Sequence, residues 1–441
     1  MIDPIIFVLR FLFDFWWLLL PFLFFQILWE KFKNYRRALY AKKMSWSFLE
    51  IKFPPGTTRS PRAMEEVFNS LHAISPDPET DLTWINLNIK GFIPRSYVFM
   101  IIAHDGKLRF FIRHPSELKE FIKTRFYSQY PEIQFKEIDD PFDFLPPNIP
   151  NSLFDCEIFD ARLNKEDAYP IKTFTVLEYL PKGQQIDPLT TFSEGAWQIS
   201  NKEWLIFQIF LLPTTPDNEE YGKKWIERGQ KVVNKLIGKK EEEEKESVLE
   251  DIKEFTVNLL LAIFRQPVWK TKEEKAKEEF NIQKLTPGER RIVELIQQKL
   301  GKLGFWCNLR ISYIATKDIF ESKRLEAKSL INSILKNFST EDLNGFSLYP
   351  LTISKPDVIS SRIFQIKRRE YISFKKCRPP TLPLKFQKKL KSKKLDKGFI
   401  LNSEELATLF HPPMEFVPPS GIERVPVREL PPSPEIPIAE L

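Results

Sequence analysis

The chain has 441 residues, a formal net charge of +7 and a sequence pI near 9.0. Its 28% charged and 14% aromatic residues exclude a disordered chain and suffice for two or three folded domains. The positive excess favours an anionic partner, either lipid headgroups or nucleic acid. Cys156, Cys307 and Cys377 lie far apart, which fits a reducing compartment and excludes a disulfide framework or a zinc knuckle.

An apolar block near the start of the chain predicts a transmembrane helix within residues 1–30. A hydrocarbon core about 30 Å thick needs about 20 apolar residues, and residues 11–29 supply that length. No small-residue cleavage site follows, so a removable signal peptide fits poorly. Asp14 and Pro21 interrupt the block and leave open an amphipathic hairpin lying on one leaflet. The side chains expected to anchor the helix are Phe11, Trp16, Trp17, Leu19, Phe22 and Trp29.

Residues 31–43 form a basic juxtamembrane segment that contains no acidic residue, and Glu30 directly precedes it. Cationic flanks stay in the cytoplasm, so we expect a single-pass protein of the cytoplasmic (cell) membrane with its N-terminus outside. The soluble region would then lie in the cytoplasm. The cations expected to contact anionic lipid are Lys31, Lys33, Arg36 and Arg37.

Residues 44–140 predict a ferredoxin-like α+β domain. Strand patterns at 46–53, 97–103, 107–113 and 133–138 alternate with two helices in the order β-α-β-β-α-β. Ser60-Pro61 marks the start of the first helix as an N-cap followed by proline at the first helical position.

Residues 151–350 predict a second α+β unit, with a charged helical insertion at about 217–285. The run from Lys239 to Glu246 within it is typical of a solvated helix or linker. The regular pattern resumes at Thr286-Pro287-Gly288-Glu289, a capping box that predicts a clear helix start. The overall fold class is therefore α+β, with two ferredoxin-like sandwich units after one transmembrane helix.

The segment 351–398 is dense in lysine and arginine, with aromatic rings between the cations. Such a pattern suits binding of phosphates with stacking of bases. A solvated basic strand and loop near anionic lipid, or docking onto an acidic protein, explains it as well. The cations expected to bind nucleic acid or an anionic surface are Arg362, Lys367, Arg368, Arg369, Lys375, Lys376, Arg378, Lys388 and Lys389.

Residues 399–411 predict a short helix capped by Ser403, and residues 412–441 a proline-rich extended tail. No GxxxxGK[ST] phosphate loop, dinucleotide fingerprint, GxSxG or HExxH motif occurs. The four histidines show neither metal-ligand spacing nor a triad arrangement. We therefore expect a protein that is not an enzyme and that needs no cofactor or metal.

The string LNSEELATLFHPP at 401–413 resembles the segment that precedes the ATPase core in TraG/TraD-like and HerA-like DNA-translocation proteins of candidate-phyla bacteria. SWSFLEIKFP, SPRAMEEVFNSLH, FFIRHPSELKEFIKTRFYSQYPE and LTPGERRIVELIQQKLGKLGF agree with it in order, so the resemblance covers about residues 44–412. It implies a membrane-anchored accessory half of a type IV secretion-like or conjugative system, without the motor's nucleotide-binding loops.

The same resemblance implies that a separate HerA/TraG-like ATPase docks where related chains continue into the motor. The side chains expected to dock it are Leu401, Leu406, Leu409, Phe410 and Pro412. The first functional hypothesis is thus a scaffold between the lipid bilayer and this motor, with which a homo-oligomer is compatible. The alternative is a membrane-tethered nucleic-acid-binding protein that contacts DNA through residues 362–397.

Overall fold

The computed structural model describes residues 19–54, 59–77, 79–175, 187–215, 224–238, 285–352, 360–378 and 398–413. Several predictions lie outside these residues. They concern the anchor residues Phe11, Trp16 and Trp17, the charged run within the insertion, the cations Lys388 and Lys389, and the tail beyond Pro413.

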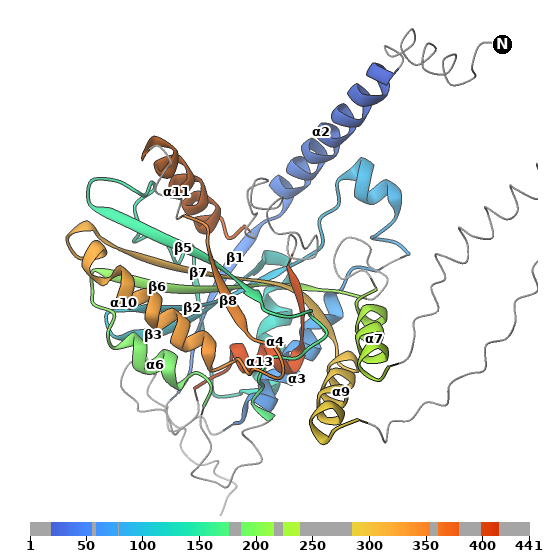
Figure 1. The fold of residues 1–441 in the computed structure, drawn as a ribbon. Helices are drawn as coiled ribbons and strands as arrows, with labels where there is room; N and C mark the ends of the chain where they lie inside the picture. The colour runs from blue at the N-terminus through green and yellow to red at the C-terminus, as the bar shows by residue number, and fades with distance from the viewer. Residues whose placement is uncertain are drawn as a thin grey trace, which may run out of the picture.

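The described strands form one antiparallel sheet in the order β4-β1-β3-β2-β6-β7-β5-β8, with β9 paired to β7 (Figure 1). The strands are β1 (Trp46–Lys52), β2 (Tyr97–His104), β3 (Lys107–Pro115), β4 (Gln134–Ile138), β5 (Phe154–Leu163), β6 (Glu203–Pro213), β7 (Gly304–Thr316), β8 (Phe346–Pro350) and β9 (Phe399–Asn402).

The two predicted α+β units are the two halves of this sheet. The first half has the order β4-β1-β3-β2, and the second repeats it as β8-β5-β7-β6. The halves join where β2 pairs with β6, from Tyr97↔Leu211 to His104↔Trp204. The mixed α+β class is therefore confirmed, but the prediction of two separate sandwiches is wrong. Both joining strands are buried almost throughout, so unpaired edges would leave backbone groups in the core without partners.

Five of the described helices cover the first face of the sheet and enclose the main core. Alternate strand residues such as Leu49, Phe99, Phe207 and Ile311 point to this face and are buried. The helices are α3 (Pro61–Leu71), α4 (Lys119–Gln129), α6 (Thr190–Ala196), α10 (Lys317–Lys336) and α13 (Ser403–Leu409).

Two helix starts follow the local signals in the sequence. Ser60 caps α3, where its side chain accepts a hydrogen bond from the Arg62 backbone, and Pro61 is the first helical residue. Thr286 and Glu289 form the predicted capping box of α9 (Pro287–Leu300). A small separate core lies between α9 and α7 (Trp225–Leu236), and α7 falls within the predicted helical insertion.

The second face is covered by residues 141–150 and by α11 (Ser360–Lys375). Tyr371, Phe374 and Cys377 are buried there, and the Phe374 ring lies 4.8 Å from that of Phe142. The described part of the basic segment is thus a packed helix, and the interpretation as a solvated strand and loop is wrong. The three buried side chains are spaced three residues apart, as one helix face requires.

The C-terminal segment returns to the middle of the molecule. β9 pairs with the first residues of β7, from Gly304↔Asn402 to Cys307↔Phe399. α13 follows directly and packs against α3. Its capping residue is Asn402, which forms a capping box with Glu405, rather than the predicted Ser403.

A buried ion pair fastens this segment to the body. The Lys299 Nζ lies 2.9 Å from the Glu405 carboxylate, and both side chains are fully buried. The same carboxylate accepts hydrogen bonds from the backbone N–H groups of Ile171 and Asn402, each at 2.9 Å. Burial raises the pKa of Glu405, whereas the Lys299 ammonium and the two backbone donors oppose this shift.

We predict that Lys299→Met lowers the free energy of unfolding of the full chain by about 3–5 kcal/mol, because it leaves a buried carboxylate without its countercharge. The effect should be measured by urea denaturation. Adding Glu405→Gln should recover part of the loss, because a neutral amide oxygen can still accept a backbone hydrogen bond.

The control for this variant is Lys202→Met. Lys202 also has a close carboxylate, at 2.7 Å on Asp318, but both side chains are more than half exposed. Such surface pairs contribute little. Equal losses for Lys202→Met and Lys299→Met would contradict a structural role for the buried pair.

Candidate functional site

The helix α2 (Leu19–Lys43) is a 25-residue extension that projects from the body of the protein (Figure 1). Its first part exposes large apolar side chains: Phe24, Phe25, Ile27 and Leu28 are 57–66% exposed. Of the predicted anchor residues, Leu19, Phe22 and Trp29 belong to α2, and Trp29 stands where the apolar part ends. Among the helices of the described residues, none has the length and hydropathy that a membrane crossing requires.

The second part of α2 carries the four cations expected to contact lipid. Lys31 is exposed, whereas Lys33 pairs with Glu30 at 2.6 Å. Arg36 and Arg37 are half-buried, and Arg36 Nε donates to the carbonyl of Ile89 at 2.6 Å. The structure therefore places all four on one helix but engages Lys33 and Arg36 in contacts within the protein.

The cations predicted to bind nucleic acid divide into two groups on α11 and the turn after it. Lys367 pairs with Asp155 at 2.7 Å, and Lys375 donates to the carbonyl of Leu145 at 3.3 Å, so both hold the helix on the sheet. The exposed cations are Arg362, Arg368, Arg369, Lys376 and Arg378. They form a basic outer surface, beside which the Phe364 ring is 45% exposed.

A row of buried polar side chains lies beneath α11, and reasoning from the sequence missed it. Asp160, Arg310 and Gln208 stand opposite one another on β5, β7 and β6. Arg162 Nε donates to Asp160 at 2.6 Å, and both side chains are buried. The sequence does carry a signal for this row: polar residues recur two positions apart in β5 and β7, in strands that are otherwise apolar. Side chains with this spacing lie on the same face of a strand.

This polar row connects the sheet to α11. Arg310 donates to Ser373 Oγ of α11 at 3.2 Å and to Gln208 Oε1 at 3.4 Å. Gln208 Nε2 in turn donates to the carbonyl of Phe374 at 3.3 Å. Burial raises the pKa of Asp160 to about 6 and lowers that of Arg310 to about 10. Because these groups are covered, they can position α11 but cannot meet a substrate from solvent.

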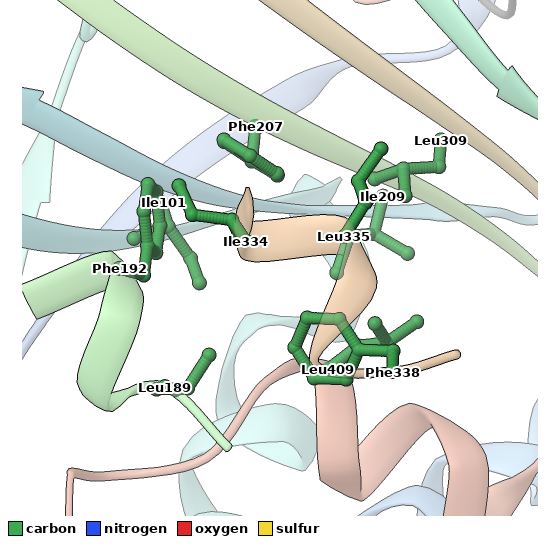
Figure 2. A pocket seen from close by; sticks show the side chains of 10 residues that line it. All are labelled: Ile101, Leu189, Phe192, Phe207, Ile209, Leu309, Ile334, Leu335, Phe338 and Leu409. Atoms are coloured by element: carbon green, nitrogen blue, oxygen red, sulfur yellow. The ribbon is translucent and has the colours of Figure 1, made fainter. Parts of the chain in front are cut away.

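A small cavity lies within the core of the described residues. The cavity in Figure 2 has a volume of about 10 Å³ and lies between the sheet, α6, α10 and α13. Its lining is wholly apolar and includes Ile101, Phe192 and Leu409. A space of this size holds at most one water molecule. Within the described part of the chain, no group of His, Cys, Asp and Glu could hold a metal ion.

The side chains expected to dock a motor are core residues in the structure. Leu401, Leu406, Leu409, Phe410 and Pro412 are all buried. The Phe410 ring lies edge-on to Phe99 and Phe110, at 4.9 and 5.6 Å between centroids. The docking assignment of these side chains is therefore corrected: the apolar face of α13 is used by the sheet and α3, and it is not free for another protein.

The chain is similar to a protein family and, weakly, to solved structures. No curated protein matches the chain. Among solved structures, a variant of berberine bridge enzyme, a reticuline dehydrogenase, is similar at 9% identity with a TM-score of 0.21. That alignment covers 67% of this chain but only 42% of the other, and a likeness this weak carries no argument.

The family model described as a domain of unknown function, DUF8128, matches residues 33–418. The match begins in the basic part of α2 and includes the whole sheet and α13. Because it covers most of the chain, the protein belongs to the DUF8128 family.

Proposed function

We propose that this protein is a non-catalytic scaffold tethered to the cytoplasmic membrane through α2. The observation that carries the proposal is the division of α2 into an exposed apolar part and a basic part. Exposed apolar clusters of this kind mark interaction surfaces. The described apolar part, Leu19–Trp29, is about 16 Å long at 1.5 Å per residue, roughly half of a hydrocarbon core.

The charge of α2 supports the cytoplasmic side for the body. Its exposed cations Lys31, Lys42 and Lys43 all follow the apolar part. Cations near an anionic leaflet contribute about 1 kcal/mol each, and they stay in the cytoplasm during insertion. The N-terminus would then lie outside the cell and the sheet inside.

The motor partner of this scaffold would be a separate HerA/TraG-like ATPase of a type IV secretion-like or conjugative DNA-translocation system. The support is the resemblance of residues 44–412 to the segment before the motor in such proteins. Since α13 is part of the core, we assign motor docking to the proline-rich residues 414–441 rather than to α13. A homo-oligomer of the scaffold is compatible with this arrangement.

The membrane tether predicts that Phe24→Asp with Leu28→Asp releases the full chain from membranes. An acidic side chain opposes membrane insertion by an amount that reaches about 2.5–3.5 kcal/mol at the centre of a membrane helix and is smaller toward its ends. The readout is the fraction of protein that remains with native membranes after a carbonate wash. Leu153→Asp with Leu325→Asp is the matched control, because both of these side chains are 67–69% exposed elsewhere on the body. Retention of the α2 variant at the control level would contradict the tether.

The docking assignment predicts that deleting residues 414–441 removes the ATPase that co-purifies with the tagged protein from native membranes. The deletion spares β9 and α13, so the fold and the membrane association should persist. Mass spectrometry of the purified complex and its urea denaturation curve check both expectations. An ATPase that stays bound to a folded, truncated chain would show that docking occurs on the sheet domain instead.

The alternative function, binding of DNA by a membrane-tethered protein, is favoured by the exposed cations of α11 with Phe364 beside them. Phosphates would pair with the cations while the ring stacks on a base. Figure 1 shows α11 and α2 extending to the same side of the body, so bound DNA would lie near the membrane.

This alternative predicts that Arg362→Glu with Arg368→Glu and Lys376→Glu weakens binding of single-stranded DNA and flattens its salt dependence. Lys231→Glu with Lys235→Glu is the control, because both residues are exposed on α7, which packs with α9 around the small separate core. Fluorescence anisotropy at several salt concentrations measures both. If wild-type binding is absent or insensitive to salt, the alternative is wrong.

A further inference from the structure

A short segment after α3 packs along α2 and was not recognised from the sequence. Within residues 81–92, Trp84 and Ile85 are helical and lead into a π-helix, η3 (Asn86–Lys90), which contacts α2. Its apolar side chains do not enter any core of the described residues: Trp84 is 61% exposed, Ile85 55% and Ile89 40%. An ordered segment that exposes several apolar side chains is typical of an interaction surface.

The backbone of this segment lies directly against the backbone of α2. Gly91 has φ +72°, and a Cβ atom there would lie 2.4 Å from the Arg36 carbonyl carbon and 2.6 Å from the Arg37 nitrogen. Only glycine permits this approach. The hydrogen bond from Arg36 to the Ile89 carbonyl holds η3 against the same turn of α2.

Aromatic rings extend this contact toward the apolar part of α2. Trp84 stacks on Trp29 with 5.9 Å between centroids and 15° between planes. Trp29 stacks in turn on Phe25 and Phe32, at 6.1 and 5.7 Å. Trp84 is thereby placed at the level where α2 changes from apolar to basic.

We propose that residues 81–92 are a second membrane-contacting element, which inserts Trp84, Ile85 and Ile89 into the headgroup region of the bilayer. This inference rests on the proposed membrane tether. Lipid is the occupant that the observations favour, because the apolar surface of residues 81–92 is continuous with that of α2 and tryptophan prefers the membrane interface. The exposed Lys90 lies at the end of η3, where anionic headgroups would meet it.

A second membrane contact beside α2 would fix the orientation of the body relative to the bilayer. A single helix would let the body rotate about the helix axis, whereas two contacts on the bilayer define one orientation. The close packing at Gly91 makes the two contacts one rigid unit. The sheet and α11 would then face the membrane at a set angle.

The test places a polarity-sensitive fluorophore on Ile85→Cys in the full chain. The native thiols Cys156, Cys307 and Cys377 are buried, and burial raises the pKa of each, so the introduced thiol reacts selectively. The labelled protein is reconstituted into vesicles of phosphatidylcholine and phosphatidylglycerol that contain a lipid spin-labelled near the headgroup. Leu325→Cys, at a position that is 69% exposed, is the control, and Ile89→Cys repeats the test should the first variant misfold.

We expect a blue-shifted emission at position 85, quenching by the spin-labelled lipid and protection from aqueous iodide, with the opposite behaviour at position 325. Flotation of the same vesicles is measured in parallel. Protein that does not float contradicts the tether itself. Protein that floats while its label at positions 85 and 89 remains open to iodide overturns the second contact alone.

Discussion

The buried ion pair between Lys299 and Glu405 is the constraint on which the centre of the fold depends. A buried carboxylate is tolerated only when its acceptors are filled, and here one ammonium and two backbone N–H groups fill them. These donors come from α9, from the segment after β5 and from β9. Glu405 therefore connects α13 to Lys299 and Ile171, which lie 106 and 234 residues earlier in the chain.

Further polar contacts beside this pair form a clamp, by which we mean the ion pairs of Lys299, Lys302 and His411, and connect it to the first half of the sheet. Lys302 lies 2.6 Å from Glu65 of α3 and 2.7 Å from Glu404 of α13. His411 Nε2 lies 3.0 Å from Asp187, and both side chains are fully buried. The string LNSEELATLFHPP is thus structural: its polar residues make the clamp, and its apolar residues complete the core.

Structural features that depend on neighbouring residues could be predicted from the sequence. Features that depend on contacts between distant parts of the chain could not. The order of elements in the first half and the caps at Ser60 and Thr286 depend on neighbouring residues. The pairing of β2 with β6 depends on two apolar edges that are far apart in the chain. The face of α13 was assigned to a partner because an apolar helix face has the same pattern whether a core or another protein covers it. Residues 81–92 were missed because Ile85, Leu87 and Ile89 alternate with polar residues, a strand-like period of two that does not indicate the π-helix formed there.

The connection between α2 and the sheet is short and is held by several contacts. Only Met44 and Ser45 separate α2 from β1, and the Ser45 carbonyl accepts a hydrogen bond from the Ser116 backbone at 3.0 Å. The Arg113 guanidinium stacks 3.8 Å above the Trp46 ring at the start of β1. Together with the backbone contact at Gly91, this holds α2 at both its basic part and its end. In the proposed membrane tether, this connection would keep α11 and Pro413 at constant positions relative to the bilayer.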